Sequence, residues 1–380
     1  MKSVFYWSPF LTNVATIQAV IKSATSLSKY SKNYDISIIN ASGEFNKYEN
    51  FLNKKNIKII NLYKFNYHKH LPSQGFILSR LSFLIIFIFS ILPLFFLIKS
   101  QKPDYFICHL ITALPILLSR FLKKTKFILR ISGLPNYTFF RKILWRFLGK
   151  NLYAITCPTK ATYDDLKNLN LFNINKLLLL RDPVIEMNKL QILKKEEINI
   201  NFNAKDFNIF CVGRLTEQKN FKLIINNFHD FLRINKNSKL FIIGHGEQQK
   251  LLHRLINENN LSKNVFLLGY QKNIFKFLYK ANLFILASKW EDPGWVLIEA
   301  ALCNTLILSS NCKNGPKELI ENDQGGVLFE NNSEISLLRS FKKINNLSNN
   351  EVYKMKLFAK KKTKYFTIFN HFVSLSKILV

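Results

Sequence analysis

The chain has 380 residues, of which 48% are hydrophobic, so a substantial core can form in two domains or one large one. Its formal net charge of +31 favours anionic partners such as nucleotides, phosphorylated substrates and acidic lipid. Its lysines are scattered, and it lacks zinc-finger spacing and an aromatic-rich RNA-binding motif, which argues against a specific nucleic-acid partner.

The N-terminus and the cysteines indicate a compartment. The segment MKSVFYWSPF reaches a proline too early to supply the apolar region of a signal peptide. Five cysteines lie in or beside apolar runs without paired spacing, as is typical of reduced, buried thiols. We therefore expect a cytoplasmic protein.

The first half of the chain alternates short apolar runs with amphipathic stretches. Helical periodicity is found in residues 16–30 and in the segments ALPILLSRFLKK and KATYDDLKNLN. The predicted strands are SVFYWS, YDISIIN, IKIINLY, DYFICHL, KFILRIS and LYAITCP. Alternation of strands and helices predicts a parallel sheet with helices on both faces.

One segment, residues 81–99 (LSFLIIFIFSILPLFFLIK), is apolar on all sides. Its uninterrupted run is shorter than the roughly 20 residues needed to cross a bilayer, and Pro93 is expected to break it. Three interpretations stay open: a buried helix of the first domain, an element docked on the membrane surface, or a true span. Arg80, Lys99 and Lys102 flank the segment, as suits a docking element beside acidic lipid.

A polar, charged and weakly periodic stretch follows the first half, and we predict an interdomain linker over residues 186–205. The alternation then restarts with the strands FNIFCVGRL, KLFIIGHGE, NVFLLGY, ANLFILAS and NTLILSS, each followed by a helical stretch. The sequence therefore predicts two doubly wound domains, over residues 1–185 and 206–361.

Glycines and cations follow the strands of the second domain. In doubly wound sheets, ligands bind beyond the carboxyl ends of the strands. Gly213, Gly244 and Gly269 come directly after predicted strands, where they mark turns or backbone that approaches a ligand closely. Arg214 and Lys219 lie at a strand exit near a helix start, an arrangement that suits an anion such as phosphate.

The segment KWEDPGWVLIEA carries two acids, Glu291 and Glu299, eight positions apart. Pro293 and Gly294 make a single helix through both unlikely to form. We therefore predict a loop acid, a turn, and a helix that begins near Trp295 and carries the second acid. A carboxylate in that place can accept hydrogen bonds from a ribose diol.

These segments resemble a known family. VGRLTEQKN, GHGE, LGYQKN, ANLFILASKWEDPGWVLIEAALCN and NGPKELI…GGVLF occur in an order similar to that of the nucleotide-sugar half of retaining glycosyltransferases of family 4. Glu291 and Glu299 look like the E-x7-E motif of that family. The resemblance covers residues 205–330 well and the first half only as a pattern.

The resemblance implies a GT-B fold, in which two Rossmann-like domains face each other across a cleft. Residues 1–185 would bind the acceptor and residues 362–380 would cross back to complete that domain. Glu291 would contact the transferred sugar, while Arg214 and Lys219 would hold the donor diphosphate. The implied donor-binding set is Gly213, Gly244, Gly246, Tyr270, Pro293, Gly294, Trp295, Val296 and Glu299.

The first half departs from the family pattern. Its first strand is followed by SPFLTNVATIQ, without glycine, and Ser132 occupies the place of a histidine found in many members. His109 is an acceptor-side candidate, or else a hydrogen-bonded histidine at a strand end. Arg130 would meet an acceptor phosphate or pair with a carboxylate. The chain lacks an Asp-x-Asp motif, so neither a catalytic metal nor a cofactor is expected.

The resulting prediction is a retaining transferase that moves a hexose or N-acetylhexosamine from a UDP-sugar to a glycan. The expected acceptor is lipid-linked, for example a polyprenyl-linked precursor of surface polysaccharide or lipopolysaccharide, reached from the inner face of the membrane. Two alternatives stay open. Another GT-B activity, such as a sugar-nucleotide epimerase, would give product without an acceptor, and a basic polyanion-binding protein would bind DNA or heparin without either glutamate.

Overall fold

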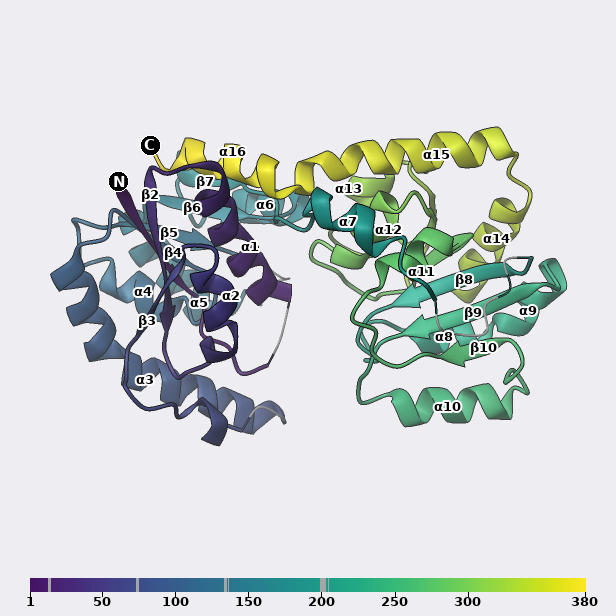
Figure 1. Ribbon diagram of the computed structural model, residues 1–380, viewed down its shortest axis with the longest axis horizontal. Helices are drawn as coiled ribbons and strands as arrows, with labels where there is room; N and C mark the ends of the chain where they lie inside the picture. The colour runs from purple at the N-terminus through teal and green to yellow at the C-terminus, as the bar shows by residue number, and fades with distance from the viewer. Residues whose placement is uncertain (13–14, 73–74, 133–134, 136, 199–202, 204) are drawn as a thin grey trace. The chain divides into compact units, whose positions relative to one another are not determined.

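The computed structural model describes residues 1–380 except 13–14, 73–74, 133–134, 136, 199–202 and 204. The chain forms two compact units (Figure 1). Unit 1 comprises Met1–Pro183 with Ile368–Val380, and unit 2 comprises Val184–Thr367. Each unit is an α/β domain built on a parallel sheet, which confirms the predicted fold class.

Within the described residues, unit 1 holds a seven-stranded parallel sheet in the order β3-β2-β1-β4-β5-β6-β7. Its strands are β1 (Lys2–Trp7), β2 (Tyr34–Asn40), β3 (Lys58–Asn61), β4 (Tyr105–Cys108), β5 (Lys126–Arg130), β6 (Ala154–Cys157) and β7 (Leu177–Leu179). Its helices are α1 (Ala15–Tyr30), α2 (Glu49–Asn53), α3 (Phe76–Gln101), α4 (Ala113–Leu118), α5 (Phe139–Leu148), α6 (Lys160–Asn168) and α16 (Ile368–Ile378).

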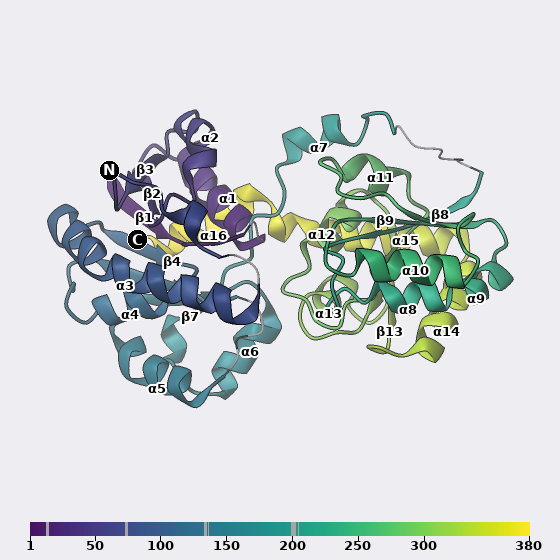
Figure 2. The same ribbon diagram turned by 90° about the horizontal axis from the view of Figure 1, so that it is seen from below.

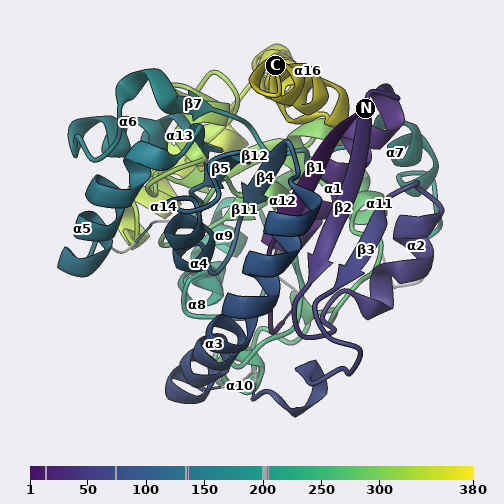
Figure 3. The same cartoon turned by 90° about the vertical axis from the view of Figure 1, so that its left-hand side faces the viewer.

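The helices of unit 1 cover both faces of this sheet. Residues of α1, α2 and α16 share one apolar cluster with one side of the strands. Residues of α3, α4, α5 and α6 share the cluster on the other side, and α4 contacts both α3 and α5 (Figure 3). Because the central strands are buried on both faces, they are continuous apolar runs in the sequence.

The C-terminal helix α16 belongs to unit 1, which confirms the expected return of the chain, and Figure 2 shows it beside α1. A buried hydrogen-bond chain anchors it. The Tyr6 hydroxyl lies 2.9 Å from Ser23 Oγ, which lies 2.8 Å from His371 Nε2. His371 Nδ1 lies 2.8 Å from the carbonyl oxygen of Arg181, so it carries the proton. Burial lowers the pKa of His371 to about 4, which keeps the ring neutral at pH 7.

Helix α3 corrects one expectation. Pro93 does not break it: the helix runs unbroken for 26 residues, from Phe76 to Gln101. A proline removes one backbone hydrogen bond, and here the buried stripe of Ser90, Leu94 and Ile98 holds the turns around it against the sheet.

The interpretation of α3 as a buried helix is also wrong, because only 28% of its most apolar window is buried. By length and composition, Ile77–Gln101 could cross a membrane, although buried core helices and signal sequences pass the same test. Its exposed large apolar side chains are Ile77, Leu78, Leu81, Leu84, Ile88, Phe89, Ile91, Leu92 and Phe96.

Unit 2 holds, in its described part, a six-stranded parallel sheet in the order β10-β9-β8-β11-β12-β13. Its strands are β8 (Phe207–Val212), β9 (Ser238–Ile243), β10 (Val265–Leu267), β11 (Leu283–Leu286), β12 (Leu306–Ser310) and β13 (Val327–Phe329). Its helices are α7 (Met187–Leu193), α8 (Phe221–Asn226), α9 (Phe228–Ile234), α10 (Gln249–Glu258), α11 (Phe275–Lys280), α12 (Trp295–Leu302), α13 (Pro316–Ile320), α14 (Glu334–Asn345) and α15 (Asn349–Lys362).

The predicted linker over residues 186–205 is only partly extended. Its first part forms α7, and Leu190 on that helix is buried in the core of unit 2. One buried leucine in a polar stretch gives little periodicity, which explains why the sequence did not predict this helix. Residues 199–202 and 204 of the linker lie outside the described residues.

Candidate functional sites

Two glycine turns meet at the carboxyl edge of the unit 2 sheet. Gly213 follows β8 and Gly244 follows β9, and the Gly244 N–H donates to the carbonyl of Gly269 at 2.9 Å. Gly244 has φ of +151°, and a Cβ placed there would lie 1.8 Å from the carbonyl oxygen of Gly213. A Cβ at Gly246 would lie 2.4 Å from the carbonyl oxygen of Leu215. These turns pack backbone against backbone, which a side chain would prevent.

Lys219 and Glu291 form a buried ion pair beside these turns. Lys219 Nζ lies 2.5 Å from Glu291 Oε1, and the two side chains are only 13% and 6% exposed. The Ser288 hydroxyl donates to the same carboxylate oxygen at 2.5 Å. A Cβ at Gly213 would lie 3.1 Å from Cε of Lys219, so the glycine leaves room for the lysine chain. The sequence predicted both charged residues but not the serine.

Hydrogen bonds tie the loop after β8 to the loop after β11. The Gln218 side chain donates to the carbonyl of Trp290 at 2.8 Å, and the N–H of Lys289 donates to the carbonyl of Gln218 at 2.8 Å. Lys289 also pairs with Glu217, which lowers the pKa of that carboxyl. The Lys219–Glu291 pair is therefore held by two loops that are fixed to each other.

Helix α12 begins at Trp295, as predicted, with Glu291 in the loop before it and Glu299 within it. Its N-cap is Gly294, with φ of +81° and no side chain to cap the first turn. The first N–H groups of a helix lack intrahelical acceptors and attract anions. Close packing fixes this start, since a Cβ at Gly315 would lie 2.0 Å from the carbonyl oxygen of Pro293.

The remaining donor-side candidates lie after β8 (Arg214), after β10 (Tyr270) and in α12 (Val296 and Glu299), and they differ in exposure. Arg214 is exposed and Tyr270 is 77% exposed, so both are open to a ligand. Glu299 is partly buried. Val296 is buried in the core of unit 2, so only its backbone can serve a ligand. The arrangement offers cations and helix N–H groups for an anion, and carboxylates for hydroxyl groups.

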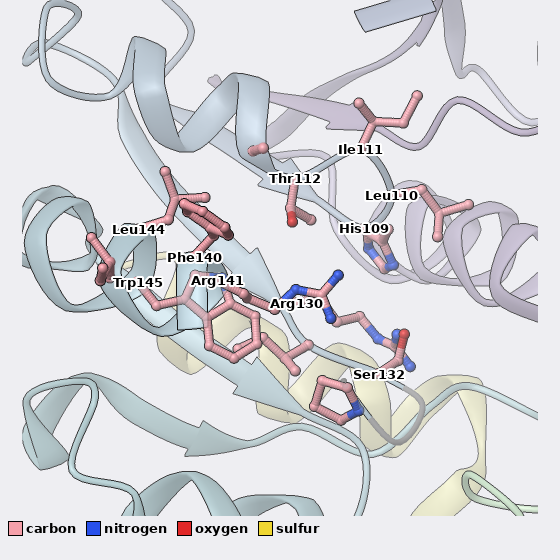
Figure 4. Close-up of a pocket in the computed structure, with 14 residues that line it drawn as sticks. His109, Leu110, Ile111, Thr112, Arg130, Ser132, Phe140, Arg141, Leu144 and Trp145 are labelled. Atoms are coloured by element: carbon pink, nitrogen blue, oxygen red, sulfur yellow. The ribbon is translucent and has the colours of Figure 1, made fainter. Parts of the chain in front are cut away.

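The acceptor-side candidates His109, Arg130 and Ser132 line one cavity of about 770 Å³ in unit 1 (Figure 4). Arg130 pairs through Nη2 with Asp182, and both side chains are 5% exposed. Arg130 thus pairs with a carboxylate, one of its two predicted alternatives. Burial lowers the pKa of His109 well below its usual range, and the Arg130 guanidinium adds to this effect. The ring of His109 is therefore neutral at pH 7.

The described residues contain no group of three His, Cys, Asp or Glu side chains placed to hold a metal ion. All five cysteines are reduced, buried thiols, as predicted. Burial raises the pKa of the Cys303 thiol to about 12 and that of Cys312 to about 11. Both thiols are therefore protonated and unreactive at neutral pH. The candidates for a chemical role in the site are the charged residues.

The chain resembles known glycosyltransferases in sequence. Residues 194–362 match the family model described as "Glycosyl transferases group 1". An uncharacterized glycosyltransferase of Methanocaldococcus jannaschii is 34% identical over 244 residues, which are 59% of each chain. The Campylobacter jejuni N-acetylgalactosamine-N,N'-diacetylbacillosaminyl-diphospho-undecaprenol 4-alpha-N-acetylgalactosaminyltransferase is 36% identical over 138 residues, 36% of this chain and 37% of the relative. The chain thus spans about three fifths or less of these relatives' length.

Solved structures match the whole chain. The structure of Anabaena Alr3699/HepE in complex with UDP aligns with 100% of this chain and 99% of its own, with a TM-score of 0.73 and 13% sequence identity. This likeness concerns the fold. Residues 194–362 thus resemble the glycosyltransferase group 1 family, and the two α/β units have the fold seen in GT-B glycosyltransferases.

Proposed function

We propose that the protein is a retaining glycosyltransferase that takes a hexose or N-acetylhexosamine from a UDP-sugar. The observation that carries this proposal is the buried Lys219–Glu291 pair, set between the glycine turns and the start of α12 in the matched domain. The UDP complex of the Anabaena structure supports the choice of nucleotide.

Departure of a nucleoside diphosphate is a problem of charge stabilisation. Lys219, Arg214 and the N–H groups at the start of α12 supply positive potential in one place, which stabilises the negative charge that develops on the leaving diphosphate. Glu291 orients Lys219 and lies next to the same helix start, where it contacts the transferred sugar. Glu299 accepts hydrogen bonds from the ribose. These cations make a metal unnecessary for departure of the diphosphate.

The proposed acceptor is a lipid-linked glycan. The Campylobacter jejuni relative is named for a diphospho-undecaprenol substrate and transfers N-acetylgalactosamine. Retention of configuration follows the resemblance to retaining enzymes of family 4, in which transfer on one face, with the leaving diphosphate helping to deprotonate the acceptor, would need no pair of catalytic carboxylates such as glycosidases use.

A panel of UDP-sugars with extracted lipid-linked acceptors tests this function. We expect one UDP-sugar to raise the melting temperature and to be consumed only when acceptor is present, with a glycolipid product of retained anomeric configuration by NMR. The absence of stabilisation by any nucleotide would refute the donor site. Sugar conversion without acceptor would favour an epimerase, and salt-sensitive heparin binding that survives loss of Glu291 and Glu299 would favour a polyanion-binding protein.

We further propose that α3 docks the protein on the inner surface of the cell membrane. The exposed apolar side chains of α3 listed above form a large exposed apolar face. Such a face is typical of a surface that contacts a membrane or another protein. At its C-terminal end, a cavity of about 360 Å³ is lined by Phe95, Phe121 and four lysines: Lys99, Lys102, Lys123 and Lys124. Apolar insertion beside clustered lysines is the pattern that binds acidic lipid.

Replacing Ile88 and Leu92 of α3 with aspartate should weaken binding to phosphatidylglycerol vesicles by more than about tenfold, because two inserted side chains are lost and two negative charges are added. Both residues are exposed, so the fold should not change. Vesicle flotation measures the effect. The exposed Ile335 of α14, changed to aspartate, is the matched control. Equal flotation of both variants and wild type would contradict docking by α3.

A further inference from the structure

The cavity in unit 1 has two chemically different walls. Figure 4 shows Phe140, Leu144 and Trp145 on one side and His109 and Ser132 on the other, with arginine side chains between them. Among the described residues that line the cavity, none is acidic. A ligand that fills it would therefore carry an anionic part and an apolar part.

The polar wall contains two buried polar atoms that have no hydrogen-bond partner among the described residues. Arg130 donates through Nη2 to Asp182, but its Nη1 is buried and has no acceptor among the described residues. Nδ1 of His109 is likewise buried without a partner. A buried polar group without a hydrogen-bond partner destabilises the fold, and more so when it is charged. Oxygen atoms of a phosphate would satisfy the guanidinium, which suits phosphate geometry.

The apolar wall comes from α5, whose sequence FFRKILWRFL alternates aromatic and basic residues. Arg141 lines the cavity and lies over the Trp145 ring, 5.9 Å from its centroid. Phe139, Phe140 and Phe147 are strongly exposed, at 72%, 82% and 66%. Helices α5, α4 and α3 cover the same face of the sheet, so this wall continues towards the apolar face proposed to meet the membrane.

We propose that this cavity binds the lipid diphosphate of the acceptor. Arg130 and Arg141 hold the diphosphate, His109 donates one hydrogen bond to it, and Phe140 with its neighbours on α5 covers the first isoprene units of the chain. The inference rests on the proposed function and names the substrate class of that function: a polyprenyl diphosphate-linked glycan.

Isothermal titration with farnesyl diphosphate, in the absence of any donor, tests the site. Farnesol lacks the anion and inorganic diphosphate lacks the chain, so both should bind at least about tenfold more weakly than farnesyl diphosphate if two walls contribute. Inorganic diphosphate that binds as tightly as farnesyl diphosphate would overturn the lipid assignment and indicate a free-anion site.

Variants locate the binding. Arg141→Glu, on the exposed face of α5, should raise the Kd of farnesyl diphosphate by about tenfold or more. The matched control is Arg146→Glu, an exposed arginine on the same helix that does not line the cavity. Equal weakening by both variants would overturn the site in favour of general charge attraction. Phe140→Ala, which removes apolar surface without adding charge, should weaken farnesyl diphosphate but leave inorganic diphosphate binding unchanged.

Arg130→Gln should also raise the Kd, and a UDP titration of each variant confirms that unit 2 is intact. The assignment of the cavity and the proposed function can be refuted separately. If the wild-type protein transfers sugar to lipid extracts but does not bind farnesyl diphosphate, the cavity assignment is wrong and the function stands. If it binds farnesyl diphosphate through Arg141 but transfers no sugar, the cavity assignment stands and the function is wrong.

Discussion

Lys219→Ala is expected to lower kcat by about 10²–10³-fold, the range seen when one preorganised charge-stabilising donor is removed. The lysine is 13% exposed and its ammonium lies 2.5 Å from Glu291, so its charge acts where water screens it poorly. The effect should fall on kcat more than on KM, because the charge on the diphosphate grows as the sugar leaves. Steady-state kinetics with the UDP-sugar that the donor panel selects measures both.

Removing the lysine also leaves Glu291 buried without its counter-charge, and this alone could distort the site. The double variant Lys219→Ala with Glu291→Gln, compared with Glu291→Gln alone, separates the two effects. If loss of charge stabilisation is the cause, the double variant is much slower than Glu291→Gln. If the uncompensated carboxylate is the cause, the double variant is as active as Glu291→Gln. The exposed Lys222, changed to alanine, controls for the loss of one positive charge and should keep wild-type kinetics.

The sequence predicted most strands of the two sheets because these buried strands are apolar runs bounded by turns. The strands β7 and β13, of three residues each, were not predicted. The sequence also did not predict helix α7, because Leu190 is the one residue of this helix that is buried in the core. Short elements are decided by tertiary contacts, which no local pattern encodes.

The sequence predicted more of the candidate site residues in unit 2 than in unit 1. In unit 2, the sequence predicted three residues from their places in the loops after strands: Gly213, Lys219 and Glu291. The structure brings these residues together. In unit 1, Asp182 gave no signal as the partner of Arg130, because 52 positions separate them. Ser288 and Arg141 look like ordinary surface residues until the neighbouring loops are placed.

Exposure was the property that the sequence predicted least well. The apolar residues of α3 are consistent with a core helix, a docked helix or a span, and composition alone cannot choose among them. The structure restricts burial to one narrow stripe of α3 and leaves most of the helix exposed. Where a partner other than water covers a surface, hydrophobicity in the sequence does not report burial within the chain.

Gly244→Ala should be the most disruptive single change in unit 2, at about 3 kcal/mol or more, from overpacking against backbone and from a strained φ. The added Cβ would lie 1.8 Å from the carbonyl oxygen of Gly213, which cannot rotate away as a flexible side chain could. Hydrogen exchange of the β8 and β9 amides measures the loss for unit 2 alone.

Gly269→Ala is the matched control, because its φ of +67° is also positive but its Cβ would meet nothing within 4 Å. It should cost only the strain of a left-handed residue, about 1–2 kcal/mol. Equal effects of the two changes would show that backbone strain, not the close approach of the two turns, sets the cost. The difference between them bears on catalysis, since Gly213 lies against the side chain of Lys219. A displaced Gly213 carbonyl would move that lysine, so Gly244→Ala should also weaken UDP binding, while Gly269→Ala should not.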